Sequence, residues 1–242
     1  MAQSAPQSLQ HHLREVKEGR RVFENAFQAV ARMILEAGIE KVVVNGKTTY
    51  DFGIFRRGRK PIIGLYDEIN SFVSYVKDAA ENGSSKEMAY VLVGEPGNGK
   101  TYFVEFLCDL YRQHLARPAN RRYTFRFRDL ERLGTYGRIQ ATESQTYEDP
   151  LVLAMNLTPD PEENRRFLAA AGGFSDTEVE RLWGQYRPLG ACSEYILNDL
   201  RAGLDGRPEE ALAPIDVIPA PMAERLGTLT GKYPAKDKIT SS

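Results

Sequence analysis

The sequence predicts an α/β fold in which helices and a parallel sheet form a three-layer core, preceded by an N-terminal helical region. Residues 89–93 are Ala, Tyr, Val, Leu and Val, a short apolar run typical of a buried parallel strand. From Thr101 to Tyr111, apolar residues recur at helical spacing. A glycine-rich stretch, residues 94–99, separates the two. The order of strand, glycine loop and helix is the local basis of the predicted fold.

The glycine-rich stretch and the two residues after it match the pattern G-x-x-x-x-G-K-[ST] of phosphate-binding loops. The eight residues are Gly94, Glu95, Pro96, Gly97, Asn98, Gly99, Lys100 and Thr101. A chance match is expected in roughly one chain of this length in a hundred. The predicted fold is therefore that of a P-loop NTPase, and the eight residues are its predicted nucleotide-binding site.

The residue types of this loop suit a polyphosphate. Gly94, Gly97 and Gly99 can adopt positive φ and have no Cβ between the backbone and a ligand. The N–H groups at the start of the following helix point toward the phosphates, and the helix dipole favours negative charge there. Lys100 is expected to reach the β- and γ-phosphates, and the Thr101 hydroxyl is expected to ligate Mg²⁺. The predicted ligands are a nucleoside triphosphate and Mg²⁺.

Length and composition indicate an ordinary soluble globular protein. The chain has 242 residues, of which 42% are hydrophobic and 27% charged, and its formal net charge is −1. Such a balance creates no overall field that attracts nucleic acid or an anionic membrane. The sequence has no apolar stretch of transmembrane length, and its N-terminus lacks the pattern of a signal peptide. We therefore expect neither a nucleic-acid nor a membrane partner.

Cysteine and histidine usage argues against redox, zinc and triad chemistry. Cys108 and Cys192 lie far apart and form no metal-binding pattern, which favours a cytoplasmic location. Cys108 follows the apolar register of its helix and is predicted to be a small core residue. His11 and His12 are predicted to face solvent, and His114 is the third and last histidine. No grouping of these residues suggests a catalytic triad or a zinc site.

The remaining sequence predicts further helices and strands around the loop. Helices are expected as a pair within 8–37, in a segment that opens over 63–69 and ends at 82–85, and over 176–183 and 191–203. Strands are expected in a hairpin around Asn45-Gly46 within 41–50, and over 123–127 and 215–218. The predicted buried stripe of the helix before the loop consists of Phe72, Val73, Val76 and Ala80. An apolar segment at 151–157 is followed by a proline turn at 158–161.

These elements suggest three parts. Residues 1–60 are expected to hold the N-terminal helices and the hairpin. Residues 61–230 are expected to form the nucleotide-binding domain, whose sheet is incomplete within this sequence. Residues 231–242 are expected to be a polar, mobile tail.

A P-loop hydrolase also needs an acidic residue after a neighbouring apolar strand, because that carboxylate orients Mg²⁺. No run of four apolar residues followed by Asp-Glu occurs after Thr101. Asp216 comes nearest to this pattern, but it follows a single isoleucine and Pro214, so a structural or surface role is favoured. The apolar residues 151–155 end in Asn156. Either the hydrolytic half is degenerate or it lies beyond residue 242, and the second interpretation is preferred.

A basic loop precedes the nucleotide-binding region. Arg56, Arg57 and Arg59 are candidates for contact with a nucleotide, a nucleic acid or a neighbouring subunit. A solvated linker is the favoured interpretation.

Three segments together carry a family resemblance. They are residues 61–80, which run into the loop, residues 144–151, which end in Pro-Leu, and residues 225–238. The chain resembles the N-terminal portion of the PrkA family, bacterial serine protein kinases with an AAA-type ATPase domain. The resemblance implies an AAA-type core, preference for ATP, a protein substrate and assembly into a homo-oligomeric ring in which a neighbour supplies an arginine. It also implies an acidic strand, sensor residues and a kinase-like domain outside these residues.

The sequence therefore favours an ATP-binding AAA-type module of a PrkA-like serine protein kinase, with Mg-ATP held by residues 94–101. The alternative is a non-catalytic nucleotide-dependent scaffold or sensor, in which ATP binding orders the chain and no turnover is needed. A third option is a small-molecule kinase of the P-loop class. It is disfavoured because the loops of such kinases lie near the N-terminus, whereas a long segment precedes this one.

Overall fold

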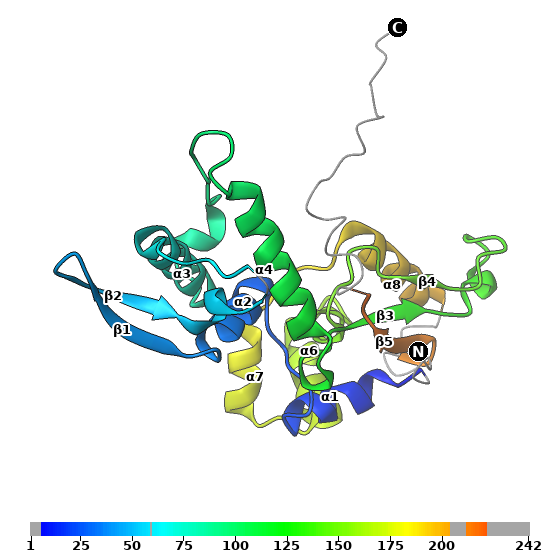
Figure 1. Ribbon diagram of the computed structural model, residues 1–242. Coiled ribbons are helices and arrows are strands. Elements are labelled where there is room, and N and C mark those ends of the chain that lie inside the picture. The colour runs from blue at the N-terminus through cyan, green and yellow to red at the C-terminus, as the bar shows by residue number, and fades with distance from the viewer. Residues whose placement is uncertain (1–5, 59, 204–211, 222–242) are drawn as a thin grey trace, which may run out of the picture. The chain divides into compact units, whose positions relative to one another are not determined.

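The computed structural model describes residues 6–58, 60–203 and 212–221 (Figure 1). These residues form two compact units. The first unit contains residues 6–23 and the described residues of 115–221, and the second unit contains 24–114. The division differs from the predicted boundary at residue 60, because the chain enters the second unit at residue 24 and returns to the first at residue 115. The predicted tail at 231–242 lies outside the described residues.

The second unit holds the predicted site. Its elements are α2 (Ala26–Leu35), β1 (Ile39–Val44), β2 (Lys47–Phe52), the 3₁₀ turn η1 (Gly53–Arg56), α3 (Tyr66–Ala80), η2 (Ser84–Glu87) and α4 (Lys100–Leu115). The hairpin of β1 and β2 is confirmed, with Val44 paired to Lys47 across a two-residue turn. Asn45 and Gly46 both have positive φ, 51° and 77°, which the favoured hairpin turn requires.

Helix α3 packs its apolar stripe inside the second unit. Its buried residues are Ile69, Val73, Val76 and Ala79. The predicted stripe was therefore wrong at Phe72 and Ala80, which are half-buried at the border of the stripe. Successive helical positions are separated by about 100°, so a shift of one residue moves a side chain from the centre of a face to its edge.

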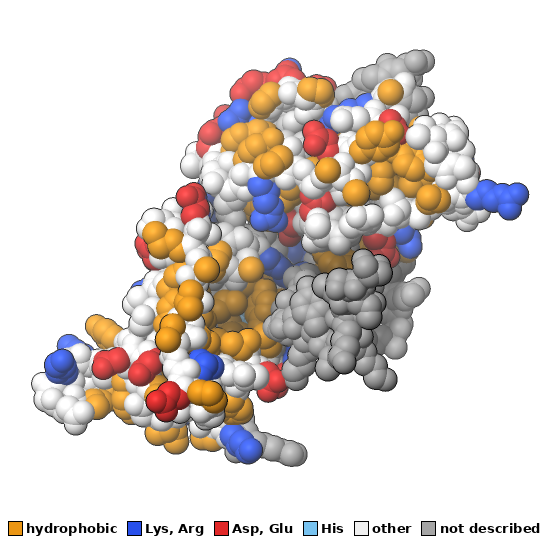
Figure 2. Space-filling view, turned by 90° about the horizontal axis from the view of Figure 1, so that it is seen from above, with side chains coloured by type: hydrophobic (Ala, Val, Ile, Leu, Met, Phe, Trp, Pro, Cys, Tyr) orange, Lys and Arg blue, Asp and Glu red, His pale blue; other side chains and the backbone are white. Residues whose placement is uncertain are grey.

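Many large hydrophobic side chains of the second unit remain at its surface. They are Ile39, Val43, Tyr50, Ile63, Leu65, Met88, Val91, Leu92, Val93, Tyr102 and Val104. Hydrophobic side chains also reach the surface on the face of the molecule drawn in Figure 2. The second unit is thus less completely enclosed than an ordinary domain core.

The first unit is built around an antiparallel sheet. Its elements are α1 (Leu9–Lys17), η3 (Pro118–Asn120), β3 (Tyr123–Phe127), η4 (Leu130–Leu133), β4 (Thr142–Glu143), α5 (Pro150–Ala154), α6 (Pro161–Gly172), α7 (Asp176–Trp183), α8 (Ala191–Gly203) and β5 (Ile215–Pro219). The strand order is β4-β3-β5, with both pairings antiparallel. The two predicted strands are confirmed, but the predicted parallel sheet is not seen among the described residues. Arg126 and Asp216 face each other in this register and form an ion pair of 2.9 Å, which favours the antiparallel arrangement.

A single hydrophobic cluster fills the first unit. Its largest fully buried side chains are Leu9, Leu13, Phe125, Phe127, Leu130, Leu151, Leu153, Met155 and Leu168. The apolar segment predicted at 151–157 begins in helix α5 and is buried on every side of that helix. The predicted helices at 176–183 and 191–203 are confirmed as α7 and α8.

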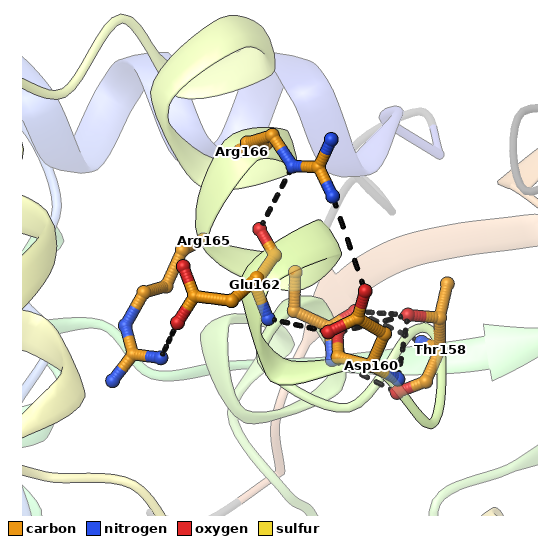
Figure 3. A network of polar contacts seen from close by, with 6 residues as sticks. Thr158, Asp160, Glu162, Arg165 and Arg166 are labelled. Atoms are coloured by element: carbon orange, nitrogen blue, oxygen red, sulfur yellow. Dashed lines mark hydrogen bonds and ion pairs between the residues drawn. The ribbon is translucent and has the colours of Figure 1, made fainter.

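Helix α6 was not predicted, because residues 158–161 were interpreted only as a proline turn. The Asp160 carboxylate accepts a hydrogen bond of 2.9 Å from the Glu162 N–H, and its backbone N–H donates to the Thr158 hydroxyl (Figure 3). Arg165 pairs with Glu162 at 2.7 Å, and Arg166 approaches Asp160 at 3.9 Å (Figure 3). An Asp cap before proline, followed by acidic residues in the first turn, was the available signal for this helix.

The helices in the described residues are too short or too polar to cross a lipid bilayer.

Candidate functional site

The eight predicted site residues lie where a loop runs into helix α4. Residues 94–99 belong to neither a helix nor a strand, and α4 begins at Lys100. In Figure 1 this loop is the arch at the N-terminal end of α4. The Phe103 N–H donates to the Gly99 carbonyl at 2.8 Å, which closes the first turn of the helix. The chain thus presents a glycine loop followed at once by the N-terminus of a long helix.

All three glycines in the loop have a positive φ, and Gly94, at +158°, lies closest to extended backbone. Gly97 has φ +90° and Gly99 has φ +76°. A Cβ built on either residue would meet no atom within 4 Å, so backbone torsion rather than crowding restricts these positions. Another residue type in the left-handed region costs about 1–2 kcal/mol. The open space beside both glycines leaves the loop backbone accessible to a ligand.

Lys100 is folded across the loop. Its Nζ donates to the Gly94 carbonyl at 2.6 Å and to the Glu95 carbonyl at 2.8 Å. Because an ammonium group has three donors, one N–H remains for an anion. The two carbonyl contacts hold the positive charge at the loop, where a phosphate would find it together with the N–H groups of the first helical turn.

Thr101 is exposed in the first turn of α4, so its hydroxyl is accessible to a metal ion bound beside the loop. In the described part of the chain, no group of His, Cys, Asp and Glu side chains is arranged to hold a metal ion. Mg²⁺ binding through Thr101 therefore stays a prediction from the sequence.

The segment before the loop is not the buried parallel strand that the sequence predicted. Residues 89–93 have no strand pairing in the structure, and Val91 and Val93 are 71% and 89% exposed. A strand is stable only beside a hydrogen-bonded neighbour. The side chains of Val91, Leu92 and Val93 therefore stay uncovered by the described residues.

Aromatic packing holds the N-terminal half of α4. Phe103 and Phe106 are buried and contact Phe55, with ring centroids 6.0 and 6.3 Å apart. Cys108, predicted to be a core residue, is only half-buried because it lies between the packed face and the exposed face of α4. Burial raises the pKa of its thiol, which disfavours a reactive thiolate.

In the basic loop after the hairpin, Arg56 forms hydrogen bonds with the strands of the hairpin. Arg56 donates to Asp51 at 2.6 Å and to Glu40 at 3.0 Å, and these hydrogen bonds raise the pKa of its guanidinium. Arg57 is exposed, and Arg59 lies outside the described residues. Arg56 therefore joins the hairpin to the following turn, and Ile54 and Phe55 beside it are buried, so this part of the loop is packed and not the solvated linker that was predicted.

Asp216 is also engaged within the fold. One carboxylate oxygen accepts a hydrogen bond from Arg126 at 2.9 Å, and the other forms an ion pair with Arg128, also at 2.9 Å. The residue is only 6% exposed. A structural role for Asp216 is confirmed by these ion pairs.

A buried polar pair in the first unit was not predicted. His12 is 1% exposed, so the prediction that it faces solvent was wrong. Its Nδ1 lies 2.7 Å from Arg21, and its Nε2 lies 4.0 Å from the Asp149 carboxylate. Burial and the Arg21 charge lower the pKa of His12 to about 3, and burial raises the pKa of Asp149 to about 6. The signal was the helical spacing of His12 with Leu9 and Leu13, which are buried on the same face of α1.

One shallow cavity of about 360 Å³ lies between the hairpin and the start of α3. Its lining residues include Val42, Tyr50, Phe52, Ile62 and Tyr66. The cavity is mostly apolar and contains none of the eight residues of the glycine loop.

No protein-family model matches the chain, and neither a curated protein nor a solved structure matches it. The PrkA resemblance and the P-loop NTPase fold therefore stay predictions from the sequence. The local geometry of residues 94–101 is the strongest functional observation.

Proposed function

We propose that this chain binds Mg-ATP through residues 94–101 and serves as the ATP-binding AAA-type module of a PrkA-like serine protein kinase. The observation that carries the proposal is the loop itself. Lys100 bridges two loop carbonyls, while Gly97 and Gly99 hold positive φ next to the start of α4. This combination supports anion binding, since it places an ammonium group and backbone donors at the same turn of the chain.

Each residue has a defined part in this proposal. The backbone N–H groups of the loop and of the first turn of α4 bind the phosphate oxygens, and Lys100 donates to the β- and γ-phosphates. Mg²⁺, when bound, neutralises the triphosphate, and the Thr101 hydroxyl holds it in place. The preference for ATP and the assembly into a ring come from the family resemblance alone.

A nucleotide-dependent scaffold or sensor is the second candidate. It is favoured by Asp216, the nearest sequence match to a metal-orienting carboxylate, whose two oxygens are already bound by arginines. A chain of this kind binds ATP and transmits the change in order to a partner without hydrolysing it.

Isothermal titration calorimetry with Mg-ATP tests the proposal. Lys100→Ala is expected to weaken binding by at least tenfold, because a charge-assisted contact to phosphate is lost. Lys77→Ala is the matched control, since Lys77 is an exposed lysine on α3 of the same unit. Equal affinities of the wild type and Lys100→Ala would contradict the assignment.

Phosphate release separates the two candidates. The kinase module is expected to turn over ATP once the acidic strand is present, whereas a sensor binds ATP with no turnover in any context. The measurement is steady-state ATP hydrolysis by this chain and by a longer chain from the same locus.

A further inference from the structure

Helix α3 presents a second face beside its buried stripe. Glu68, Ser71, Phe72 and Tyr75 lie at positions i, i+3, i+4 and i+7, which share one side of a helix. This face contacts residues 88–90, the segment that leads into the glycine loop. Helix α3 therefore packs against the chain immediately before the candidate site.

Two tyrosine hydroxyls add hydrogen bonds to the apolar contacts between α3 and this segment. The Tyr75 hydroxyl donates to the Met88 carbonyl at 2.7 Å. The Tyr90 hydroxyl lies 3.3 Å from the Ser71 hydroxyl, and the rings of Tyr75 and Tyr90 are 5.1 Å apart. Position and direction of the segment are thus set by α3 up to Tyr90, after which the side chains of the loop are exposed.

Phe72 contacts both flanks of the loop. Its ring meets Tyr90 edge-to-face, with centroids 5.4 Å apart and planes at 76°. The same ring meets Phe103 at 5.3 Å and 89°. Tyr90 lies four residues before Gly94, and Phe103 lies three residues after Lys100. One side chain therefore links the incoming segment to the first turn of α4.

We propose that Phe72 is a positioning residue for the phosphate loop. By holding Tyr90 and Phe103 against the same ring, it sets the separation between the two ends of the loop. The loop then meets a ligand with its N–H groups already arranged, so less ordering has to accompany binding. This inference rests on the proposed function, and it names the residue that organises the proposed site.

The aromatic character of the Phe72 ring, and not only its volume, orients Tyr90 and Phe103. Edge-to-face pairs are directional because the edge of one ring carries positive charge and the face of the other carries negative charge. An aliphatic side chain at position 72 would fill part of the space and would fix neither neighbour in orientation. Phe72 is half-buried, so its truncation leaves the buried stripe of α3 in place.

The test combines Mg-ATP calorimetry with amide hydrogen exchange of peptides covering residues 91–99 in the nucleotide-free protein. Phe72→Leu is expected to weaken Mg-ATP binding by about tenfold and to speed exchange in these peptides, since two directional ring contacts are lost. Phe72→Tyr keeps the ring and is expected to restore both values to within twofold of the wild type, about 0.4 kcal/mol.

Phe27→Leu is the matched control. Phe27 is another half-buried phenylalanine of the second unit, and the ring it contacts is that of Tyr75, at 6.0 Å. Its truncation is expected to change neither the affinity nor the exchange of 91–99. Circular dichroism checks that each variant is folded. If Phe72→Leu unfolds, Tyr90→Leu takes its place, because it removes only the incoming half of the contact.

The outcomes separate this inference from the proposed function. Faster exchange of 91–99 in Phe72→Leu, with no ATP binding by the wild type, supports the positioning role and overturns the nucleotide proposal. Tight ATP binding by the wild type, with Phe72→Leu indistinguishable from Phe27→Leu in both measurements, overturns the positioning role alone. Weaker Mg-ATP binding and faster exchange of 91–99 in Phe72→Tyr as well as in Phe72→Leu would also overturn it, because the ring would then not be the cause.

Discussion

The two units of the molecule differ in how completely they bury their apolar side chains. The first unit surrounds one continuous cluster that includes both strands of its central pair and helices α1, α5 and α6. Its exposed large hydrophobic residues are Ile139, Tyr186 and Tyr195, whereas the others in the described chain all belong to the second unit. The candidate site lies in the less enclosed unit.

This difference is consistent with the separate demands of stability and binding. A loop that must accept a ligand cannot itself be buried, and binding loops belong to regions of low local stability. The second unit compensates with aromatic contacts on each side of the loop, formed by Phe55, Phe72 and Phe103. We expect the first unit to determine global stability and the second to determine the affinity for a ligand.

The largest effect is expected in the first unit. Leu153 is fully buried in α5, and Leu153→Ala should lower the free energy of unfolding by about 2–5 kcal/mol, because it leaves a cavity. Val93→Ala in the second unit should change it by less than about 0.5 kcal/mol, because Val93 is exposed. Urea unfolding followed by far-ultraviolet circular dichroism measures both, because Trp183, the single tryptophan, lies in the first unit alone. Similar losses in the two variants would refute the contrast between the units.

The next effect concerns the backbone of the loop. Gly99 has φ +76°, so Gly99→Ala should cost about 1–2 kcal/mol in the conformation that the loop now holds. Part of this cost should appear as weaker Mg-ATP binding in calorimetry. Gly46→Ala is the control, since Gly46 holds nearly the same torsion, φ +77°, in the hairpin turn and lies outside the glycine loop. An unchanged affinity in Gly99→Ala would show that the ligand-bound loop does not use this torsion.

The stability of the first unit should depend on pH through its buried pair, His12 and Asp149. The lowered pKa of His12 makes stability fall as the pH drops from about 6.5 toward 3, because only the unfolded state then binds the proton. The raised pKa of Asp149 acts in the opposite direction between about 4 and 6, because only the folded state binds the proton. In the wild type the two dependences should largely cancel between pH 4 and 6.

Asp149→Asn should expose the contribution of His12. Asparagine still caps α5, and stability should then fall by about 1 kcal/mol per pH unit on acidification from pH 6 to 5. Asp160→Asn, at the exposed cap of α6, should leave the wild-type slope unchanged. Urea midpoints at the two pH values measure the slopes. If stability changed with pH equally in the Asp149→Asn variant and in the wild type, the opposing contributions of His12 and Asp149 would be contradicted.

The smallest effect is expected in the segment before the loop. Tyr75→Phe keeps the ring and removes the hydrogen bond to the Met88 carbonyl, a net loss of about 0.5–1 kcal/mol. The change should raise amide exchange of residues 88–93 with little shift in global unfolding. A lower urea midpoint without faster exchange of this segment would show that the two units unfold together.

Local chemistry made much of the fold predictable. The Asn45-Gly46 pair has one favoured use between β-prone runs, and the hairpin formed there. Helices α7 and α8 were predicted with the bounds they have, because their caps and apolar spacing agree. Asp160 and Pro161 indicate the start of helix α6. The helix was not predicted, because the proline was interpreted only as a break.

Pairings between distant segments were not predictable in the same way. The strands at 123–127 and 215–218 were expected, but their antiparallel partnership depends on contacts such as Arg126 with Asp216. The segment 89–93 has the composition of a buried strand, yet it has no partner strand among the described residues. A strand pattern specifies which side chains prefer burial and leaves the neighbour undefined.

The sequence by itself determined the octapeptide that ends in Lys100 and Thr101, the hairpin and most of the helices, because torsional preference and side-chain spacing act over a few residues. Tertiary structure alone decided that His12 is buried beside Asp149, that Asp216 is bound by two arginines, and that Phe72 contacts both sides of the loop. The physical reason is distance along the chain. Which remote side chains meet depends on how the whole chain packs, and no local pattern of residues contains that information.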